Sequence, residues 1–446
     1  MGCVPNVRRS TEGGETMRHL LADAPRSPRE SASAQAPKRR YHELDWLRAL
    51  IIVALVPAHT LGFFTATTGQ YYGTQYHSPV SLSTMMTVGS WGIALLFLVA
   101  GAAANFALRD RTPRQYVAER FLRLMAPFLF ASLTLIPLQD YLILHNFPHV
   151  VSQISVPAGW NPHYADSPVT FYLYFVDAYF TYLIHYTPQY EFIFWSQLWF
   201  IPRLFVISLL TLPLLLFLRN ARGQRMIGWL ASLCERYRGA VFLLVAPLIV
   251  VDAALGWQWQ GWEVVGAPDT ANVVAQFLFF TIVYLNGFVI YSNERLRNAV
   301  RRDGGVVALI VAGIAFSISL VSGLGNRQLA HDYSAGGVQT AALLSVAAWL
   351  AMVGVLGLGM RFLAITNRVG QYLSEASYPF YVLHLSVLYL IALPLIASGA
   401  PAVLSFCVSV LFTVVVTFAI YELVVRRIGV LRLLFGLHRV PKAAVA

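Results

Sequence analysis

Long apolar stretches recur along this chain from Leu47 onward. A helix of about 18 or more apolar residues is long enough to cross ~30 Å of hydrocarbon. The pattern therefore predicts an all-α polytopic membrane protein with about ten transmembrane helices. We expect them near residues 46–66, 84–108, 120–143, 192–218, 239–256, 272–292, 304–323, 338–360, 377–397 and 401–424.

Three other regions flank or interrupt the predicted membrane domain of residues 45–424. Residues 1–44 are rich in Arg, Ser, Ala, Pro and Glu without an apolar period, which predicts a disordered cytoplasmic tail. Residues 145–191 form an aromatic-rich periplasmic segment. Within it, residues 168–187 are apolar but interrupted, and we expect an interfacial helix there. Residues 425–446 read as a basic cytoplasmic tail.

The composition excludes a soluble protein. Hydrophobic residues make up 57% of the chain and charged residues only 12%, whereas soluble domains carry about 25% charged residues. The three cysteines are far apart and in no metal-binding spacing, so we expect neither a disulfide framework nor a metal site.

The distribution of positive charge predicts the orientation of the helices. Of the 32 Lys and Arg residues, all but Arg203 and Arg327 fall in the N-terminal stretch through Arg48, in the C-terminal tail of residues 425–446, or in alternate stretches around the connections between predicted helices (109–123, 219–238, 293–302 and 361–368). Such an excess marks the cytoplasmic side of a membrane protein. Both termini are therefore expected in the cytoplasm. The net charge of +11 reflects membrane topology, and we expect no nucleic-acid partner.

The first predicted helix carries two polar residues with a specific spacing, Arg48 and His59. Eleven steps of 100° end about 20° past three full turns, so the two side chains share a helix face ~16 Å apart along the axis. Arg48 then lies at the cytoplasmic rim and His59 at mid-membrane. An ionisable residue at that depth favours a functional role, although a hydrogen bond between helices is the alternative.

Two arginines begin the third predicted helix, Arg120 and Arg123. They are i, i+3 neighbours on one face, and guanidinium groups bind phosphate in a forked geometry. This favours a polyanion at the cytoplasmic mouth. The alternative is that both residues only anchor the helix at the membrane surface, with Glu119 paired to Arg123.

The fourth and ninth predicted helices each carry a polar stripe. Arg203 is expected to face a cavity or a polar partner instead of lipid. Hydrogen bonds that pack the helices together are the alternative for both stripes. The stripes comprise Ser196, Trp199 and Arg203 in one helix and Ser377, Tyr381 and His384 in the other.

Aromatic side chains crowd the segment of residues 145–191, which contains no Lys or Arg. Rings with polar tips suit a sugar, because the ring face stacks on C–H groups and the tip bonds a hydroxyl. An aromatic belt at the membrane interface is the alternative. The residues are Trp160, Tyr164, Phe171, Tyr172, Tyr174, Phe175, Tyr179, Phe180, Tyr182, Tyr186 and Tyr190.

These motifs together resemble the acyltransferase-3 membrane family over roughly residues 40–440, and within it most closely the glucan biosynthesis protein C type. The resemblance rests on Arg48 and His59, on Arg120 and Arg123, on Leu198-Trp199-Phe200, on the Ser377-Tyr378-Pro379 run that ends at His384, and on Tyr421-Glu422-Leu423. Two positions depart from the family pattern: Gln197 stands where a His is expected, and Arg203 is not part of the motif.

The resemblance implies a membrane O-acyltransferase of the bacterial inner membrane, with no bound cofactor. It would move an acetyl or succinyl group from cytoplasmic acyl-CoA to a hydroxyl of an extracytoplasmic glycan. His59 would be the general base. Arg48, Arg120 and Arg123 would hold the donor phosphates. A homodimer is left open.

A rival interpretation is an exporter of a glycan or small molecule, in which His59, Arg203 and Asp252 form a proton relay. Paired broken helices in two repeated halves would favour it, and the sequence shows no such repeat. A membrane structural or sensory protein is a third possibility, without a visible output domain.

Overall fold

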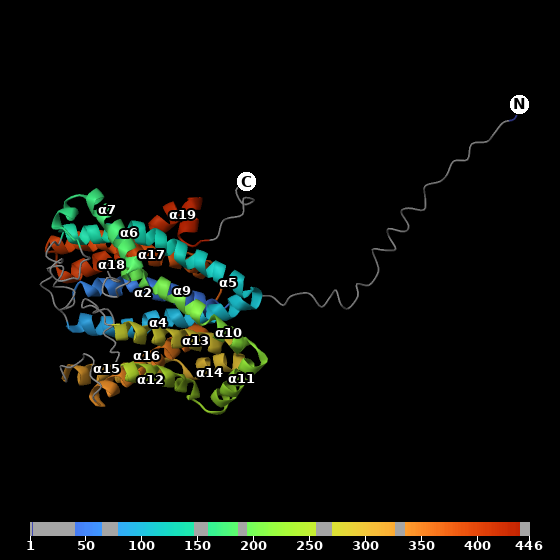
Figure 1. Ribbon diagram of the computed structural model, residues 1–446. Helices are drawn as coiled ribbons and strands as arrows, with labels where there is room; N and C mark the ends of the chain where they lie inside the picture. The colour runs from blue at the N-terminus through green and yellow to red at the C-terminus, as the bar shows by residue number, and fades with distance from the viewer. Residues whose placement is uncertain are drawn as a thin grey trace. The chain divides into compact units, whose positions relative to one another are not determined.

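The computed structural model describes Gly2 and residues 41–64, 79–146, 159–185, 194–255, 270–325 and 335–437. Within these residues every regular element is a helix (Figure 1). The long helices are α2 His42–Gly62, α4 Pro79–Asp110, α6 Ala126–Asn146, α13 Thr270–Ser292, α15 Val306–Gly325, α16 Ala335–Phe362, α17 Arg368–Ala397 and α18 Ala402–Ile420. The fold class predicted from the sequence, an all-helical polytopic protein, is therefore confirmed.

Shorter elements connect, extend or break these long helices. They are α5 Pro113–Arg120, η2 Phe121–Met125, η4 Pro162–Asp166, α7 Pro168–Ile184, η6 Ser196–Trp199, α9 Phe200–Leu210, α10 Leu212–Arg219, α11 Ala221–Arg236, η7 Ala240–Val245, α12 Ala246–Leu255, α14 Glu294–Asp303, η8 Tyr421–Val425 and α19 Gly429–Leu434.

The first helix, α2, is the central element of the bundle. It packs against α4, α16, α17 and α18, and its apolar residues Leu47, Ile52 and Val56 are buried. On one side, α17 also packs against α6 and α18. On the other side, α4 pairs with α13, and α16 pairs with α12 and α15. The helix that carries Arg48 and His59 is therefore surrounded by protein.

The described residues contain fewer candidate membrane spans than the ten that the sequence predicts. In this part of the chain seven helices are long and apolar enough to cross a membrane, or up to nine if each of two bent pairs is one span. The pairs bend by 51° at Thr211, between α9 and α10, and by 69° between α14 and α15. The remaining predicted span, 239–256, is a shorter apolar helix, Ala240–Leu255. The count of ten is not confirmed.

Several helices begin earlier than the apolar pattern predicts, because polar caps extend them. The third span begins at Pro113, where Thr112 and Gln115 form a capping box, so Arg120 and Arg123 lie well inside it. The ninth begins at Arg368, since the side chain of Asn367 accepts from the Gly370 N–H. Caps of this kind satisfy backbone donors that the hydrophobic pattern does not reveal.

The predicted boundaries of both tails also shift. Helix α2 begins at His42, inside the predicted tail of residues 1–44. In the tail predicted for 425–446, residues up to 437 are described and pack back on the bundle. Helix α19 lies there, Arg432 pairs with Glu375 of α17 at 3.5 Å, and Phe435 is buried.

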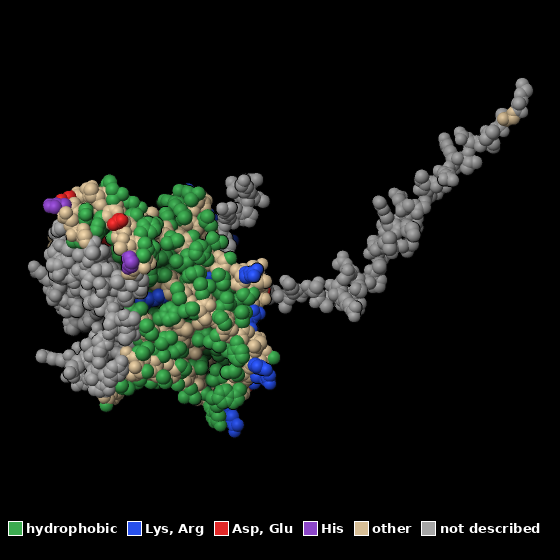
Figure 2. All heavy atoms as spheres, viewed as in Figure 1, with side chains coloured by type: hydrophobic (Ala, Val, Ile, Leu, Met, Phe, Trp, Pro, Cys, Tyr) green, Lys and Arg blue, Asp and Glu red, His purple; other side chains and the backbone are tan. Residues whose placement is uncertain are grey.

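Most of the visible Lys and Arg side chains lie at the end of the bundle that carries α5 and α11 (Figure 2). Some of these cations hold the structure together. Arg361 donates to the carbonyl oxygens of Arg301, Arg302 and Gly304 at 2.6–3.1 Å, and so caps the end of α14. The clustering agrees with the charge pattern of the sequence, while the cytoplasmic location of this end stays a prediction.

Helices α4 and α13 approach each other closely at two glycines. A Cβ atom on Gly101 would overlap the carbonyl oxygen of Tyr284, and a Cβ atom on Gly287 would overlap that of Leu98. Small residues allow this backbone approach between membrane helices. The approach also fixes Tyr284 and Phe280, which are fully buried on α13.

We therefore expect Gly101→Ala to destabilise the protein by about 1–3 kcal/mol, because the added methyl group must push the two backbones apart. Gly313→Ala is the matched control, since no atom lies within 4 Å of its Cβ position; it should leave stability unchanged or raise it slightly. Thermal unfolding midpoints in detergent measure both, and equal midpoints would contradict the close approach.

Candidate active site

Arg48 of α2 is anchored on the first turns of α17. Its Nε donates to Ser377 Oγ at 3.2 Å, and its Nη2 donates to Ser374 Oγ at 2.9 Å and to the Ser374 carbonyl oxygen at 3.0 Å. Asp45 also accepts from Ser374 Oγ, at 2.9 Å, and pairs with Arg48 at 3.5 Å. The guanidinium thus ties two helices together while its side chain stays 40% exposed.

His59 faces the same neighbouring helix as Arg48, as the sequence predicts. Its ring centroid lies 5.5 Å from that of His384 on α17, with 36° between the planes. His384 is completely buried, and its Nδ1 lies 2.7 Å from the Tyr381 carbonyl oxygen. Two imidazoles therefore meet in the interior of the bundle, on the face that Arg48 marks at its rim.

Tyr381 and Gln197 join α17 to η6. The Tyr381 hydroxyl donates to the Gln197 carbonyl oxygen, and Gln197 Nε2 donates to the Val382 carbonyl oxygen at 3.5 Å. Gln197 is only 4% exposed. The residue that departs from the family pattern in the sequence therefore lies against the helix that carries His384.

A second polar bridge runs between α6, α17 and η6 through Gln139. Its Nε2 donates to Ser386 Oγ at 2.6 Å, and its Oε1 accepts from Ser196 Oγ at 3.5 Å. All three residues are buried. The polar groups of three elements thus meet on the part of α17 around His384.

Of the stripe that the sequence predicts, Trp199 and Arg203 lie together: the Arg203 guanidinium is 4.7 Å from the centroid of the Trp199 ring and also donates to Gln276 of α13. Ser196 departs from it. Residues 196–199 form a 3₁₀ turn, and Ser196 has a positive φ of 41°, so α-helical arithmetic does not apply there. Arg203 therefore has a polar and an aromatic partner.

Arg120 and Arg123 have different surroundings. Arg120 lies over the Tyr116 ring at 5.1 Å, and the Tyr116 hydroxyl meets that of Tyr284 at 3.0 Å. Arg123 pairs with Glu119 at 3.2 Å and is half exposed. The wider π turn of residues 121–125 separates them. The pairing with Glu119 is the alternative foreseen from the sequence.

Asp252 lies in a different helix contact from His59. It is fully buried on α12 and accepts from Ser345 of α16. Arg203 contacts Gln276 of α13, and His59 contacts His384 of α17. These three residues therefore belong to separate helix pairs and do not form the continuous proton relay of the exporter interpretation.

The aromatic segment is partly described, over residues 159–185. The rings of Trp160, Tyr164 and Tyr174 pack on one another, the last two stacked at 4.6 Å. Tyr179 and Tyr182 are buried against Phe194. Many of these rings therefore pack the protein itself, whereas Tyr186 and Tyr190 lie outside the described residues.

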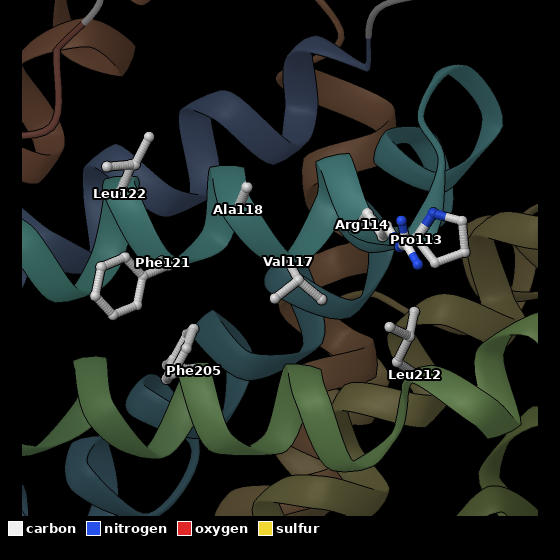
Figure 3. Close-up of a pocket in the computed structure, with 8 residues that line it drawn as sticks. All are labelled: Pro113, Arg114, Val117, Ala118, Phe121, Leu122, Phe205 and Leu212. Atoms are coloured by element: carbon white, nitrogen blue, oxygen red, sulfur yellow. The ribbon is translucent and has the colours of Figure 1, made fainter.

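An apolar groove of about 770 Å³ lies apart from these polar residues, between α5–η2 and α9–α10. Figure 3 shows Phe121 and Phe205 near one end and Arg114 near the other. The groove's lining suits a hydrocarbon chain, and neither Arg120 nor Arg123 belongs to it.

Sequence reasoning missed several residues of the polar centre: Asp45, Ser374, Gln139, Asp140 and Ser386. Gln139 and Asp140 are adjacent polar residues inside an apolar span. This interruption of the apolar pattern is the signal that could have identified them. Ser374 lies before the predicted start of its helix, so the helix boundary concealed it.

Apolar spans packed around the paired rings of His59 and His384 form a multi-pass membrane protein with a candidate catalytic centre inside the bundle. The sequence model of the acyltransferase domain family, Acyl_transf_3, matches residues 41–422. The chain therefore belongs to this family, and it is a membrane acyltransferase. Searches of curated proteins and of solved structures found no match.

We expect Arg48→Lys to lower stability by about 1–3 kcal/mol, because one ammonium group cannot reproduce the fork onto Ser374 and Ser377. Arg295→Lys is the matched control: its partner Glu235 lies 3.4 Å away and both side chains are more than half exposed, so the change should stay within ~0.5 kcal/mol. Thermal unfolding in detergent compares them. Equal losses of stability in the two variants would show that the hydrogen bonds of Arg48 stabilise the protein no more than a surface ion pair does.

Proposed function

We propose that this acyltransferase moves an acetyl or succinyl group from cytoplasmic acyl-CoA to a hydroxyl of an extracytoplasmic glycan. The bacterial inner membrane is the proposed location. The observation that carries the proposal is the position of His59 in the bundle interior, beside His384 and on the helix face that Arg48 occupies at the rim.

His59 acts as the general base in this proposal. The imidazole takes the proton of the glycan hydroxyl as its oxygen attacks the thioester carbonyl. The new C–O bond forms and the C–S bond breaks. The leaving coenzyme A thiolate then takes the proton from the imidazolium. An imidazole is the group that proteins use most often for this kind of proton transfer, and such catalysis contributes ~10²–10⁴-fold.

Arginines at the predicted cytoplasmic end serve the donor. Arg48 lies near the start of α2, and Arg120 and Arg123 lie where α5 continues into η2; guanidinium groups bind phosphates well. Arg48 and His59 are ~16 Å apart along α2. A donor held by its phosphates at the rim can therefore place its thioester near His59. This arrangement brings a cytoplasmic donor to an acceptor that enters from the other side.

His59→Gln should lower acyl transfer by ~10² or more, because Gln keeps a hydrogen bond but cannot shuttle a proton at neutral pH. The assay follows labelled acetyl-CoA or succinyl-CoA with purified protein and a panel of glycans. Binding of acyl-CoA should persist. His59→Ala should still insert and fold, since one lost interhelical bond is worth ~1 kcal/mol.

Near-full transfer by His59→Gln would make His59 structural and the mechanism wrong. Absence of transfer by the wild-type protein to any glycan in the panel would contradict the proposed function itself.

Replacing Arg120 and Arg123 together by Gln should raise the KM for acyl-CoA about tenfold or more, as expected for the loss of charge-assisted contacts to phosphate. The KM for the glycan should change much less. Arg426→Gln is the control, because Arg426 forms an i, i+4 pair with Glu422 at 3.0 Å like that of Arg123 with Glu119. An unchanged donor KM in the double variant would return both arginines to a purely structural role.

A further inference from the structure

The buried polar atoms without partners among the described residues include three acceptors that lie on α17 or on elements packed against it. They are Gln197 Oε1, His384 Nε2 and Asp140 Oδ2. A buried polar atom that finds no partner costs free energy, so such atoms call for an explanation. Neighbouring groups fix the chemical character of each of the three atoms.

The amide of Gln197 is oriented by its surroundings. Its nitrogen donates to the Val382 carbonyl oxygen, which can only accept. The other end of the amide is therefore oxygen, an acceptor, and it is the end that lacks a partner.

His384 is oriented in the same way. Its Nδ1 lies 2.7 Å from the Tyr381 carbonyl oxygen, and because a carbonyl only accepts, Nδ1 carries the proton. In the neutral ring Nε2 then presents a lone pair. This unpartnered atom belongs to the ring that lies beside His59.

Asp140 adds a carboxyl group. It follows Gln139 in α6, and its Oδ2 is buried without a hydrogen bond to any described residue. A carboxyl group keeps acceptor capacity whether or not it is protonated. The unsatisfied groups are therefore two neutral acceptors and one carboxyl group.

The hydrogen bonds described above place these residues close together. Gln197 contacts Tyr381 and Val382, while Gln139, next to Asp140, bonds Ser386. Ser196, next to Gln197, also bonds Gln139. Residues 381–386 span about one and a half turns, ~7.5 Å of helix. Gln197 and His384 therefore border one short stretch of α17, and Asp140 lies in α6, which packs against α17.

A set of acceptors needs a ligand that donates several hydrogen bonds. The phosphates and thioester of acyl-CoA are acceptors and its pantetheine arm offers isolated amide N–H donors, whereas a carbohydrate presents several adjacent hydroxyl donors. We propose that Gln197, His384 and Asp140 form the subsite that binds the hydroxyl groups of a polyhydroxylated acceptor beside His59. This inference rests on the proposed function and assigns the residues that orient the acceptor.

Gln197 and Asp140 are positioning residues in this proposal. They accept hydrogen bonds from hydroxyls that do not react, and so direct one hydroxyl toward His59. This gives Gln197, the departure from the family pattern, a role in acceptor choice.

The test uses the full-length protein in lipid nanodiscs with labelled acetyl-CoA, methyl glucoside and the monodeoxy analogues of methyl glucoside. Gln197→Met and Asp140→Leu should each raise the KM for methyl glucoside about tenfold, as the loss of a buried hydrogen bond predicts, and leave the KM for acetyl-CoA unchanged. Asp252→Leu is the matched control, because Asp252 also has a buried, unpartnered oxygen but lies between α12 and α16; it should change neither KM.

The deoxy analogues test the pairing of individual groups. One monodeoxy glucoside should lose about tenfold in kcat/KM with the wild-type protein and lose nothing further with Gln197→Met, as in a double-mutant cycle. An unchanged donor KM and a single peak in gel filtration show that a variant is folded. If Asp140→Leu does not fold, Asp140→Asn, which replaces one acceptor by a donor, is used instead.

Wild-type transfer combined with unchanged glucoside KM values in the variants would overturn the subsite and leave the proposed function standing. Saturation-transfer NMR in the absence of acetyl-CoA measures binding of methyl glucoside independently of transfer. Binding that the variants weaken, without any transfer, would support the subsite and overturn the proposed function.

Discussion

The contact between α2 and α17 is the interaction on which the candidate site depends. Arg48 ties the N-terminal parts of the two helices together through Ser374 and Ser377, and about three turns further on the same helices bring His59 against His384. A guanidinium group with several protein acceptors gives this contact one register, because shifting either helix by a residue would break the fork. The imidazoles are then aligned by the same register.

A second constraint comes from the surrounding apolar medium. Polar groups buried among membrane helices must find partners within the protein, and most of those near α17 do. Gln139, Ser386 and Ser196 satisfy one another, and Tyr381 reaches the Gln197 backbone. Gln197 Oε1, His384 Nε2 and Asp140 Oδ2 are among the buried atoms that find no partner in the described residues. Acceptors of this kind beside the base that we propose are suited to a substrate rich in hydroxyl groups.

Packing in the rest of the bundle holds the helices that carry the candidate site in place. Close approach at Gly101 and Gly287 holds α4 to α13, and α4 in turn packs on α2. The arginines at the end that carries α5 and α11 are divided between structure and exposure: Arg361 caps α14, whereas Arg114 is exposed beside the apolar groove. Some arginines at this end therefore stabilise the fold, whereas others are exposed.

The sequence by itself determined what depends on local period and composition. Hydrophobic length gave the helices, and the spacing of Arg48 and His59 placed both on one face, because helical geometry is local. Only the tertiary structure decided which elements meet. The partners of Arg48, the His59–His384 contact and the Gln139 bridge join residues far apart in the chain, and no spacing encodes them. Capping by Thr112 and Asn367 and the 3₁₀ turn at Ser196 also escaped the apolar pattern, because hydrogen bonds of the backbone, and not hydrophobicity, set them.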